Sequence, residues 1–318
     1  MGVATLLTGI AWTTIMIVTG LLLPLLLEGI RRIIRARIQR RIGPPVLQAF
    51  YDLGKLFNIP PVLPTKNMLL ITIPYIVFTV SVLLAAMIPV PYIPGLSVAT
   101  DMITFIYILI LVILLSCLAG LVVSNPYMNA GSSRELYMLS VIEVFTALLI
   151  AAFAVKLGTL NLYDIALRFG QLENMLHPST ILLIVSLFIY SYIESGYVPF
   201  DVAEAETEVL GGPLLEYSGR YYGLMMYAGL IKRFVLASIV ASLVFVSPLT
   251  NYLHGFIGEE YLPIVSYIIY IVSVTIVSMF YYVIEAMNPR YRVDIAVKPI
   301  LLVSLIPLTG LILGWFGW

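Results

Sequence analysis

Carboxylates cluster in the segment 199–223, PFDVAEAETEVLGGPLLEYSGRYYG. Asp201 follows a proline and precedes a helix-compatible stretch, which predicts a helix N-cap. In that helix Asp201, Glu204 and Glu208 share one face, since offsets of three and four residues bring side chains within about 5–6 Å. Such carboxylates repel one another, and protonation of at least one relieves the repulsion. We therefore predict that the cluster changes its proton affinity when a nearby charge changes.

Two further carboxylates flank this face. Glu206 points away from it, and Glu216 follows the helix break that Gly211, Gly212 and Pro213 predict. Two alternatives stay open for the whole cluster. It could be a solvated acidic loop, or it could bind a metal through carboxylates alone, with no imidazole to support the site.

Arginines dominate the segment 28–66, EGIRRIIRARIQRRIGPPVLQAFYDLGKLFNIPPVLPTK. We predict that the first hydrophobic helix continues as a basic helix until Gly43, Pro44 and Pro45 stop it. Residues 46–57 then repeat apolar side chains at helical spacing, which predicts an amphipathic helix along the membrane interface. The candidate partner-docking residues are Glu28, Arg31, Arg32, Arg35, Arg37, Arg40, Arg41, Asp52 and Lys55.

This basic segment has two interpretations. The arginines could anchor the chain to anionic lipid headgroups and orient it. They are more numerous than orientation requires, however, and arginine binds the carboxylates of a protein partner through paired hydrogen bonds. We therefore expect the segment to dock a partner protein as well as to touch membrane lipid.

A few ionisable side chains lie inside the predicted membrane spans, where charge is expensive and often functional. Glu143, Lys232 and Arg233 are placed deepest, whereas Glu194 and Glu285 are close to helix ends and could snorkel to the interface. All of them fall in the half of the bilayer that adjoins the basic connections. A chain that carried ions across by itself would need such groups through the full thickness, so we expect the other half to be a seal.

A polytopic helical bundle must position these residues. The chain is 61% hydrophobic and 11% charged, whereas soluble domains carry about 25% charged residues. Its apolar runs are long enough to cross a hydrocarbon core of roughly 30 Å. The predicted fold class is therefore all-α, with eight transmembrane helices at about 3–27, 67–88, 102–124, 137–157, 180–198, 222–247, 262–284 and 295–316.

Charge and cysteine content set further bounds. The connection between the first two spans carries eight of the 17 basic residues, more than any other connection, so the positive-inside rule places it in the cytoplasm and both termini outside. We expect one transmembrane domain over 1–318, with cytoplasmic segments 28–66 and 199–223. The 17 basic and 17 acidic residues cancel, so no long-range field attracts nucleic acid. With Cys117 as the only cysteine and two histidines in connections, we expect the chain itself to bind no cofactor or metal.

Both charged segments resemble a known family. RARIQRRIGPPVLQAFYDLGKL is similar to the first cytoplasmic segment of the subunit 1 family of respiratory complex I and its membrane-bound hydrogenase relatives, and PFDVAEAETEVLGGPLLEYSG is similar to that family's most specific motif. Complex I members carry an inserted stretch after the GP turn, which here is only Gly43, Pro44 and Pro45. The shorter form resembles the membrane subunit of archaeal-type group 4 energy-converting nickel–iron hydrogenases, which use ferredoxin rather than quinone.

The resemblance implies roles for individual residues. Glu28 and the arginines after it match the stretch that docks peripheral subunits, and the carboxylates of 199–223 match an acidic loop below a partner's terminal iron–sulfur cluster. Glu143 and Glu194 resemble the acidic start of a hydrophilic path towards antiporter-like subunits. The ion-coupling candidates are Glu143, Glu194, Asp201, Glu204, Glu206, Glu208, Glu216, Lys232, Arg233 and Glu285.

The expected function is that of a non-catalytic coupling subunit in the plasma membrane. It would dock hydrogenase-like large and small subunits on the cytoplasmic side, and the iron–sulfur clusters and a nickel–iron centre would lie in those partners. It would link ferredoxin-dependent hydrogen evolution to proton or sodium translocation by antiporter-like membrane subunits. A sulfane-sulfur-reducing or quinone-reducing complex could use the same design, and a stand-alone ion transporter is the alternative of another class.

Overall fold

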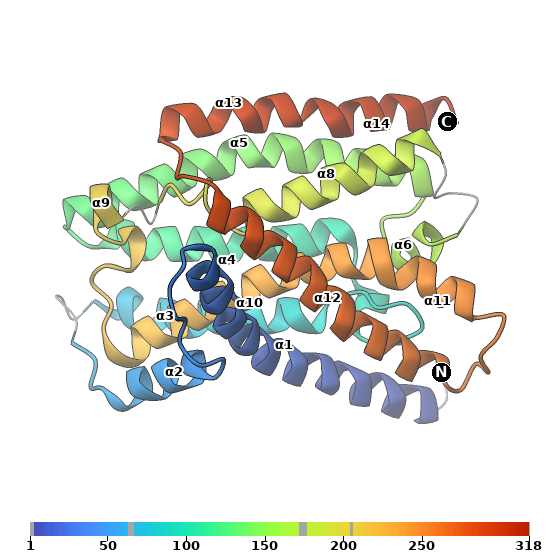
Figure 1. Cartoon of the computed structure of the whole chain (residues 1–318), viewed down its shortest axis with the longest axis horizontal. Helices are drawn as coiled ribbons and strands as arrows, with labels where there is room; N and C mark the ends of the chain where they lie inside the picture. Colours follow the sequence, from blue (N-terminus) through green and yellow to red (C-terminus); the bar gives the residue numbers. More distant parts are fainter. Residues whose placement is uncertain (1–2, 63–66, 172–176, 204–205, 318) are drawn as a thin grey trace.

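The computed structural model describes residues 3–62, 67–171, 177–203 and 206–317. These residues form a bundle of long helices packed side by side (Figure 1). Seven helical units of the described chain are long and apolar enough to cross a membrane. They are α1 (Val3–Ile38), α3 (Met68–Ala86), α4 (Met102–Val122), α5 (Pro126–Leu157), α10 to α11 (Gly219–Leu253), α12 (Leu262–Met287) and α13 (Val293–Val303) continued by α14 (Leu305–Trp315).

The predicted fifth span corresponds to α8, which covers Pro178–Glu194. This helix is apolar but has only 17 residues, so it is shorter than the other candidate spans. The all-helical, multi-pass architecture is therefore confirmed, while the count of eight crossings stays a prediction.

Short elements mark the two ends of the bundle. Figure 1 shows α2 (Gln48–Asn58) and α9 (Glu206–Val209) at one end, which we call the charged end. At the opposite or far end lie α6 (Leu162–Phe169), α11 (Ser247–Leu253), the start of α1 and the end of α14. Two 3-10 turns, Leu96–Ala99 and Gly212–Leu214, lie in the connections before α4 and before α10. Which membrane face each end occupies stays a prediction.

The basic helix and the amphipathic helix differ in their bounds from the prediction. α1 ends at Ile38 rather than at Gly43, and Arg40 adopts a positive φ of 55° directly after it. The chain then turns back so closely that a Cβ on Gly29 would lie 1.8 Å from the Val46 carbonyl oxygen. α2 follows and buries Leu53 against α1 and α10, which fixes this helix on the bundle.

Helix α5 starts much earlier than predicted, at Pro126 instead of 137. The Asn125 side chain accepts a hydrogen bond from the Tyr127 backbone N–H, and Pro126 occupies the first turn, so the two residues form a strong helix start. The small residues that follow are helical because they pack closely: a Cβ on Gly131 would lie 2.5 Å from the Gly212 Cα atom. Arg134, which was expected in a connection, therefore lies within the helix.

Helix α10 is the centre of the bundle. It spans Gly219–Ala241 and packs against α1, α3, α8 and α12. A π-helical segment, Ser242–Val246, joins it to α11 without interrupting the apolar unit. Because lipid removes most of the hydrophobic driving force between helices, such a centre depends on close packing and hydrogen bonds.

Hydroxyl groups supply some of those hydrogen bonds in the half of the bundle next to the far end. The Tyr270 hydroxyl donates to Ser238 Oγ at 2.9 Å. Ser242 donates to the Pro89 carbonyl oxygen and Ser247 donates to the Ala166 carbonyl oxygen. These bonds tie α10 and α11 to α12, to the segment after α3 and to α6, so these hydroxyls are engaged in holding the bundle together.

Candidate functional site

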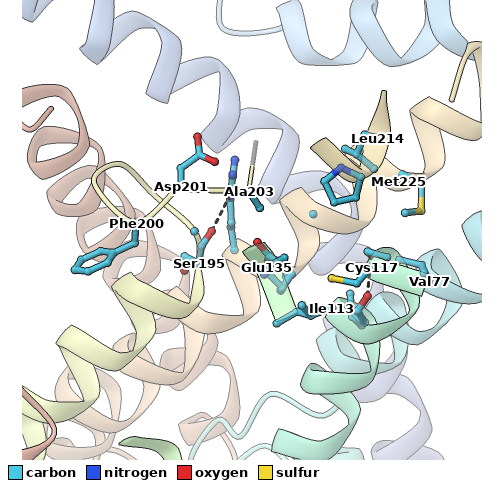
Figure 2. A pocket seen from close by; sticks show the side chains of 17 residues that line it. Val77, Ile113, Cys117, Glu135, Ser195, Phe200, Asp201, Ala203, Leu214 and Met225 are labelled. Atoms are coloured by element: carbon cyan, nitrogen blue, oxygen red, sulfur yellow. Dashed lines mark hydrogen bonds between the residues drawn. The ribbon is translucent and has the colours of Figure 1, made fainter. Parts of the chain in front are cut away.

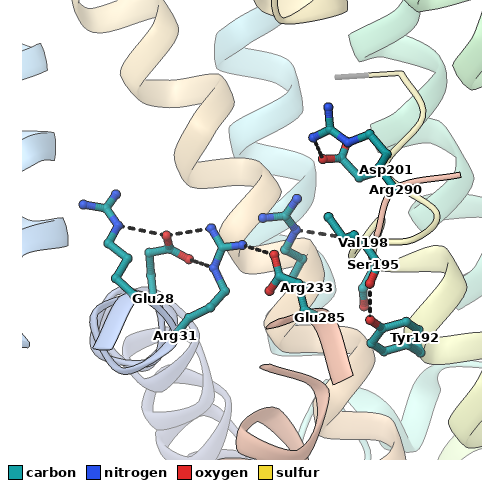
Figure 3. Close-up of polar contacts among 10 residues, drawn as sticks. Glu28, Arg31, Tyr192, Ser195, Val198, Asp201, Arg233, Glu285 and Arg290 are labelled. Atoms are coloured by element: carbon teal, nitrogen blue, oxygen red, sulfur yellow. Dashed lines mark hydrogen bonds and ion pairs between the residues drawn. The ribbon is translucent and has the colours of Figure 1, made fainter. Parts of the chain in front are cut away.

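Charged residues of α1, α2 and α12 form one network at the charged end. Arg31 donates from Nε and Nη2 to the two oxygens of Glu28 at 2.7 and 2.8 Å, and from Nη1 to Glu285 at 2.8 Å (Figure 3). Arg32 donates to Glu28 at 3.1 Å and to Asp52 at 2.5 Å. Glu28 and Glu285 are only 5% and 7% exposed. We call Glu28, Arg31, Arg32, Asp52 and Glu285 the ion-pair network.

Membership of the ion-pair network separates the predicted docking residues into two groups. Glu28, Arg31, Arg32 and Asp52 bind one another, so their charges are used inside the protein. The remaining candidates are exposed at the charged end: Arg35, Arg37, Arg40, Arg41 and Lys55. Among these, Arg41 donates to the side chain of Gln39 at 2.7 Å.

Arg233 of α10 lies next to the ion-pair network. Its Nε donates to the Ser195 carbonyl oxygen at 3.1 Å, and its guanidinium lies 5.2 Å from the centre of the Tyr197 ring. A very small cavity of about 10 Å³ is lined by Glu28, Tyr197 and Arg233 among others. Tyr197 itself is only 3% exposed, so its ring closes this side of the ion-pair network from solvent.

A larger cavity of about 110 Å³ opens on the other side of Arg233, and we call it the main cavity. Four charged side chains line it: Glu135 of α5, Asp201 of the acidic loop, and Lys232 and Arg233 of α10. Figure 2 shows Glu135 and Asp201 on its wall together with Ser195 and Cys117. The main cavity thus places both signs of charge around a space large enough for several water molecules.

A third cavity of about 30 Å³, the small cavity, continues from Glu135 towards Glu194 of α8. Glu194 is 4% exposed, and its Oε1 atom has no hydrogen-bond partner among the described protein atoms. Glu135 lines both the main cavity and the small cavity, so it joins Lys232 on one side to Glu194 on the other.

Glu135 was missed because the fourth span was expected to begin two residues after it. The Asn125-Pro126 pair is a helix-start signal, and recognising it would have placed Glu135 about two and a half turns inside α5. The sequence alone does not show that Glu135 faces α8 and α10, because its orientation depends on the packing of helices that are distant in sequence.

The described part of the acidic loop, residues 199–216, does not place Asp201 and Glu208 on one helix face as predicted. The described chain has no helix at Asp201, and α9 is a single turn, Glu206–Val209. Asp201 accepts a hydrogen bond from Arg290 at 2.6 Å and Glu208 accepts one from Arg134 at 2.6 Å. The prediction that these two carboxylates share a helix face is wrong, because cations from other elements hold each of them separately.

The loop holds three more of the predicted site carboxylates: Glu204, Glu206 and Glu216. Glu216 accepts a hydrogen bond from the Asn125 side chain, the same residue that caps α5. Glu204 lies outside the described residues, and only the backbone of Glu206 is described. Among the described residues no three His, Cys, Asp or Glu side chains come together as metal ligands would.

Glu143 differs from the other deep carboxylates because it is exposed on the flank of α5. Its neighbour Val144 is also 51% exposed, so this surface faces outward from the bundle. Glu143 still acts electrostatically on Glu194. The two predicted relay residues therefore lie near each other, one inside the bundle and one on its surface.

Comparisons with known proteins agree on the family. A family model described as NADH dehydrogenase matches residues 11–316. The chain is 34% identical over 229 residues to hydrogenase-4 component C of Escherichia coli, covering 70% of this chain and 71% of that protein. It is 31% identical over 213 residues to formate hydrogenlyase subunit 4 of the same organism, covering 66% and 69%. It is also 32% identical over 236 residues to a subunit of the NADH-quinone oxidoreductase of Helicobacter acinonychis, covering 68% and 71%.

A solved structure of the membrane-bound sulfane sulfur reductase, an archaeal respiratory membrane complex, shares the fold. The two chains superpose with a TM-score of 0.80 at 23% sequence identity, over 96% of this chain and 99% of that chain. The three sequence relatives are, by their names, components or subunits of larger assemblies. The chain accordingly belongs to the NADH dehydrogenase family, that of subunit 1 of respiratory complex I.

Proposed function

We propose that this protein is the membrane subunit that docks a peripheral redox arm and couples its electron transfer to ion translocation. The arm would oxidise ferredoxin and evolve hydrogen or reduce sulfane sulfur, with its iron–sulfur clusters and metal centre in partner subunits. Translocation would take place in neighbouring antiporter-like membrane subunits. The similarity to components of hydrogenase-4 and formate hydrogenlyase, and the fold shared with a sulfane sulfur reductase, support this assignment.

One observation carries the proposal: charged groups and cavities follow one another from the charged end to the flank of α5. The ion-pair network contacts Arg233 through the 10 Å³ cavity, and Arg233 and Lys232 line the main cavity. Glu135 connects the main cavity to Glu194, and Glu194 interacts with Glu143. Buried ionisable groups are costly inside a membrane, so a series of them supports a functional path.

The outward position of Glu143 supports transfer to a neighbouring subunit. A carboxylate on a lipid-facing surface at this depth would be strongly unfavourable. A partner helix that presents a polar or basic side chain to Glu143 would remove that cost. The path is therefore proposed to leave the protein sideways, through α5, rather than to cross to the far end.

The turn after α1 supports an acceptor other than quinone. The short form of this turn is the feature by which the sequence resembles the hydrogenase-like members of the family rather than the quinone-reducing members. Here the Val46 backbone lies directly against Gly29, and Leu53 of α2 packs between Leu25 and Leu230. These side chains fill the region between α1, α2 and α10.

Substitution of Glu143 tests the coupling role. In membrane vesicles that contain the assembled complex, Glu143→Gln should leave ferredoxin-driven product formation measurable while the ion gradient falls to background, because the lateral step loses its ionisable group. Glu143→Asp, which keeps a carboxylate, and Glu259→Gln, which alters an exposed far-end glutamate, serve as matched controls. A normal gradient in Glu143→Gln would refute the proposed path.

A further inference from the structure

The small cavity holds two carboxyl groups in an otherwise apolar enclosure. Glu135 reaches it from α5 and Glu194 from the end of α8. The other lining residues contribute no side-chain oxygen or nitrogen; they are Ile113, Met138, Leu139, Ile142, Ile193, Gly196 and Phe200. Glu194 Oε1 is buried without a hydrogen-bond partner among the described protein atoms, which is a costly position for an anionic oxygen.

The charges around this pair do not balance it. Lys232 of α10 acts on both glutamates and supplies one positive charge for two carboxylates. Of the other groups that act on Glu135, Asp201 is bound to Arg290, and Arg233 also acts on Glu28 of the ion-pair network. Of the other long helices that pack on α5, α4 and α14 carry no charged residue, and α13 carries one of each sign, Asp294 and Lys298, so it adds no net charge.

Two more groups face the pair without supplying a cation. Glu143 adds further negative charge next to Glu194, and Tyr190 contributes a neutral hydroxyl one turn before it on α8. The pair itself therefore lacks one positive charge, and neither of these groups supplies it.

The volume of the small cavity and the number of its oxygen ligands decide which cation can supply the missing positive charge. Hard metal cations are held by a shell of about six oxygen ligands. The lining side chains offer only two carboxyl groups, and about 30 Å³ leaves room for one or two water molecules. A proton needs no such shell, because two carboxyl groups and a bridging water can share it.

We infer that Glu135 and Glu194 hold one proton between them across a bridging water, and that Glu135 passes this proton between the main cavity and Glu194. The carboxylic acid of one glutamate donates its proton to the water while the water donates a proton to the carboxylate of the other. No bond to carbon changes and no electron moves. This inference deepens the proposed function by assigning the proton, rather than sodium, to this step.

Infrared spectroscopy of the assembled complex tests the inference without turnover. At neutral pH the wild type should show the carbonyl stretch of a protonated carboxyl group, with its expected shift in deuterated water. Glu135→Gln should lose this band, because Lys232 then balances the remaining Glu194 carboxylate. Glu194→Gln, on a different helix, should also lose the band, because Lys232 then balances the remaining Glu135 carboxylate. Glu259→Gln should keep the band. Lys232→Met should increase the band twofold, since two protons are then needed.

Two outcomes would overturn the inference. Survival of the band in either glutamine variant would mean that one glutamate holds the proton alone. A band in the wild type that declines as sodium replaces potassium in the buffer would mean that sodium competes for the site. Neither measurement depends on ion pumping, so a failure of the Glu143 experiment leaves this result interpretable.

Discussion

Glu28 is a buried member of the ion-pair network that binds two arginines. It is 5% exposed and accepts hydrogen bonds from Arg31 and Arg32 at once. Removing one partner of a buried ion pair typically costs about 3–5 kcal/mol, because the other charge stays buried without compensation. The two arginines are therefore part of the fold, while the exposed arginines that follow them are free to act on other molecules.

Asp52 carries a pH dependence at the edge of the same network. Its burial opposes ionisation, but hydrogen bonds from Arg32 and Gln48 outweigh this effect and lower the pKa of the carboxyl below its ordinary value of 3.8. A lowered pKa in the folded state stabilises the protein above the unfolded-state pKa, and this stability is lost as the pH falls through the folded-state value. The side chain is 33% exposed, so the contribution is about 1 kcal/mol or less.

We therefore expect the thermal unfolding midpoint of the detergent-solubilised wild type to fall more steeply than that of Asp52→Asn between about pH 5 and about pH 3. The variant should be less stable than the wild type at neutral pH, and the two should converge in acid. Parallel curves for the two proteins would show that the Arg32–Asp52 pair contributes nothing to folding.

At the scale of elements, the early start of α5 has the largest consequences. It makes Arg134 a helix residue that holds Glu208, and it gives Glu135 its place between the main and small cavities. The order of the long apolar helices and the presence of α2 could be predicted from hydropathy and helical periodicity. The partners of Asp201 and Glu208 could not, because Arg290 and Arg134 are distant in sequence and only packing brings them to the loop.

Close packing of Gly131 predicts how the acidic loop is held. A Cβ there would lie 2.5 Å from the Gly212 Cα atom and 3.2 Å from the Ala203 carbonyl oxygen, so Gly131→Ala must push the loop away from α5. We expect a loss of about 1–3 kcal/mol from overpacking, measured by thermal unfolding, together with faster proteolysis of the loop.

Gly54→Ala is the matched control for that substitution. Gly54 also lies inside a helix, and a Cβ there meets nothing within 4 Å. This change should stabilise the protein by up to about 1 kcal/mol through helix propensity alone. Equal effects of the two substitutions would show that the loop does not rest on α5.

At the scale of the whole molecule, equal numbers of acidic and basic residues conceal a strong local asymmetry. The exposed positive charges around the end of α1 are Arg35 and Arg37 in its last turn and Arg40 and Arg41 just after it. Their concentration at the charged end could be recognised from the order of residues. By contrast, the hydrogen bond that ties Arg31 into the bundle is accepted by Glu285, which is 254 positions away along the chain.

Reversal of charge on this surface should release the peripheral arm. We expect Arg37→Glu with Arg41→Glu to lose the peripheral subunits on native gels, because carboxylates of the partner would meet like charge. The control, Arg220→Glu with Arg292→Glu, makes the same change in net charge at other cations of the chain. Release in both double variants would attribute the effect to net charge, and retention in both would exclude docking at these arginines.

The hydroxyl groups next to the far end have a consequence for the cell that makes this protein. Tyr270, Ser238, Ser242 and Ser247 donate or accept hydrogen bonds within the bundle, so they bind its helices to one another in this half. The charged cavities lie towards the other end. Under the proposed function, we expect that a copy inserted before its partners does not leak ions, so that uneven synthesis of the subunits would not dissipate an ion gradient.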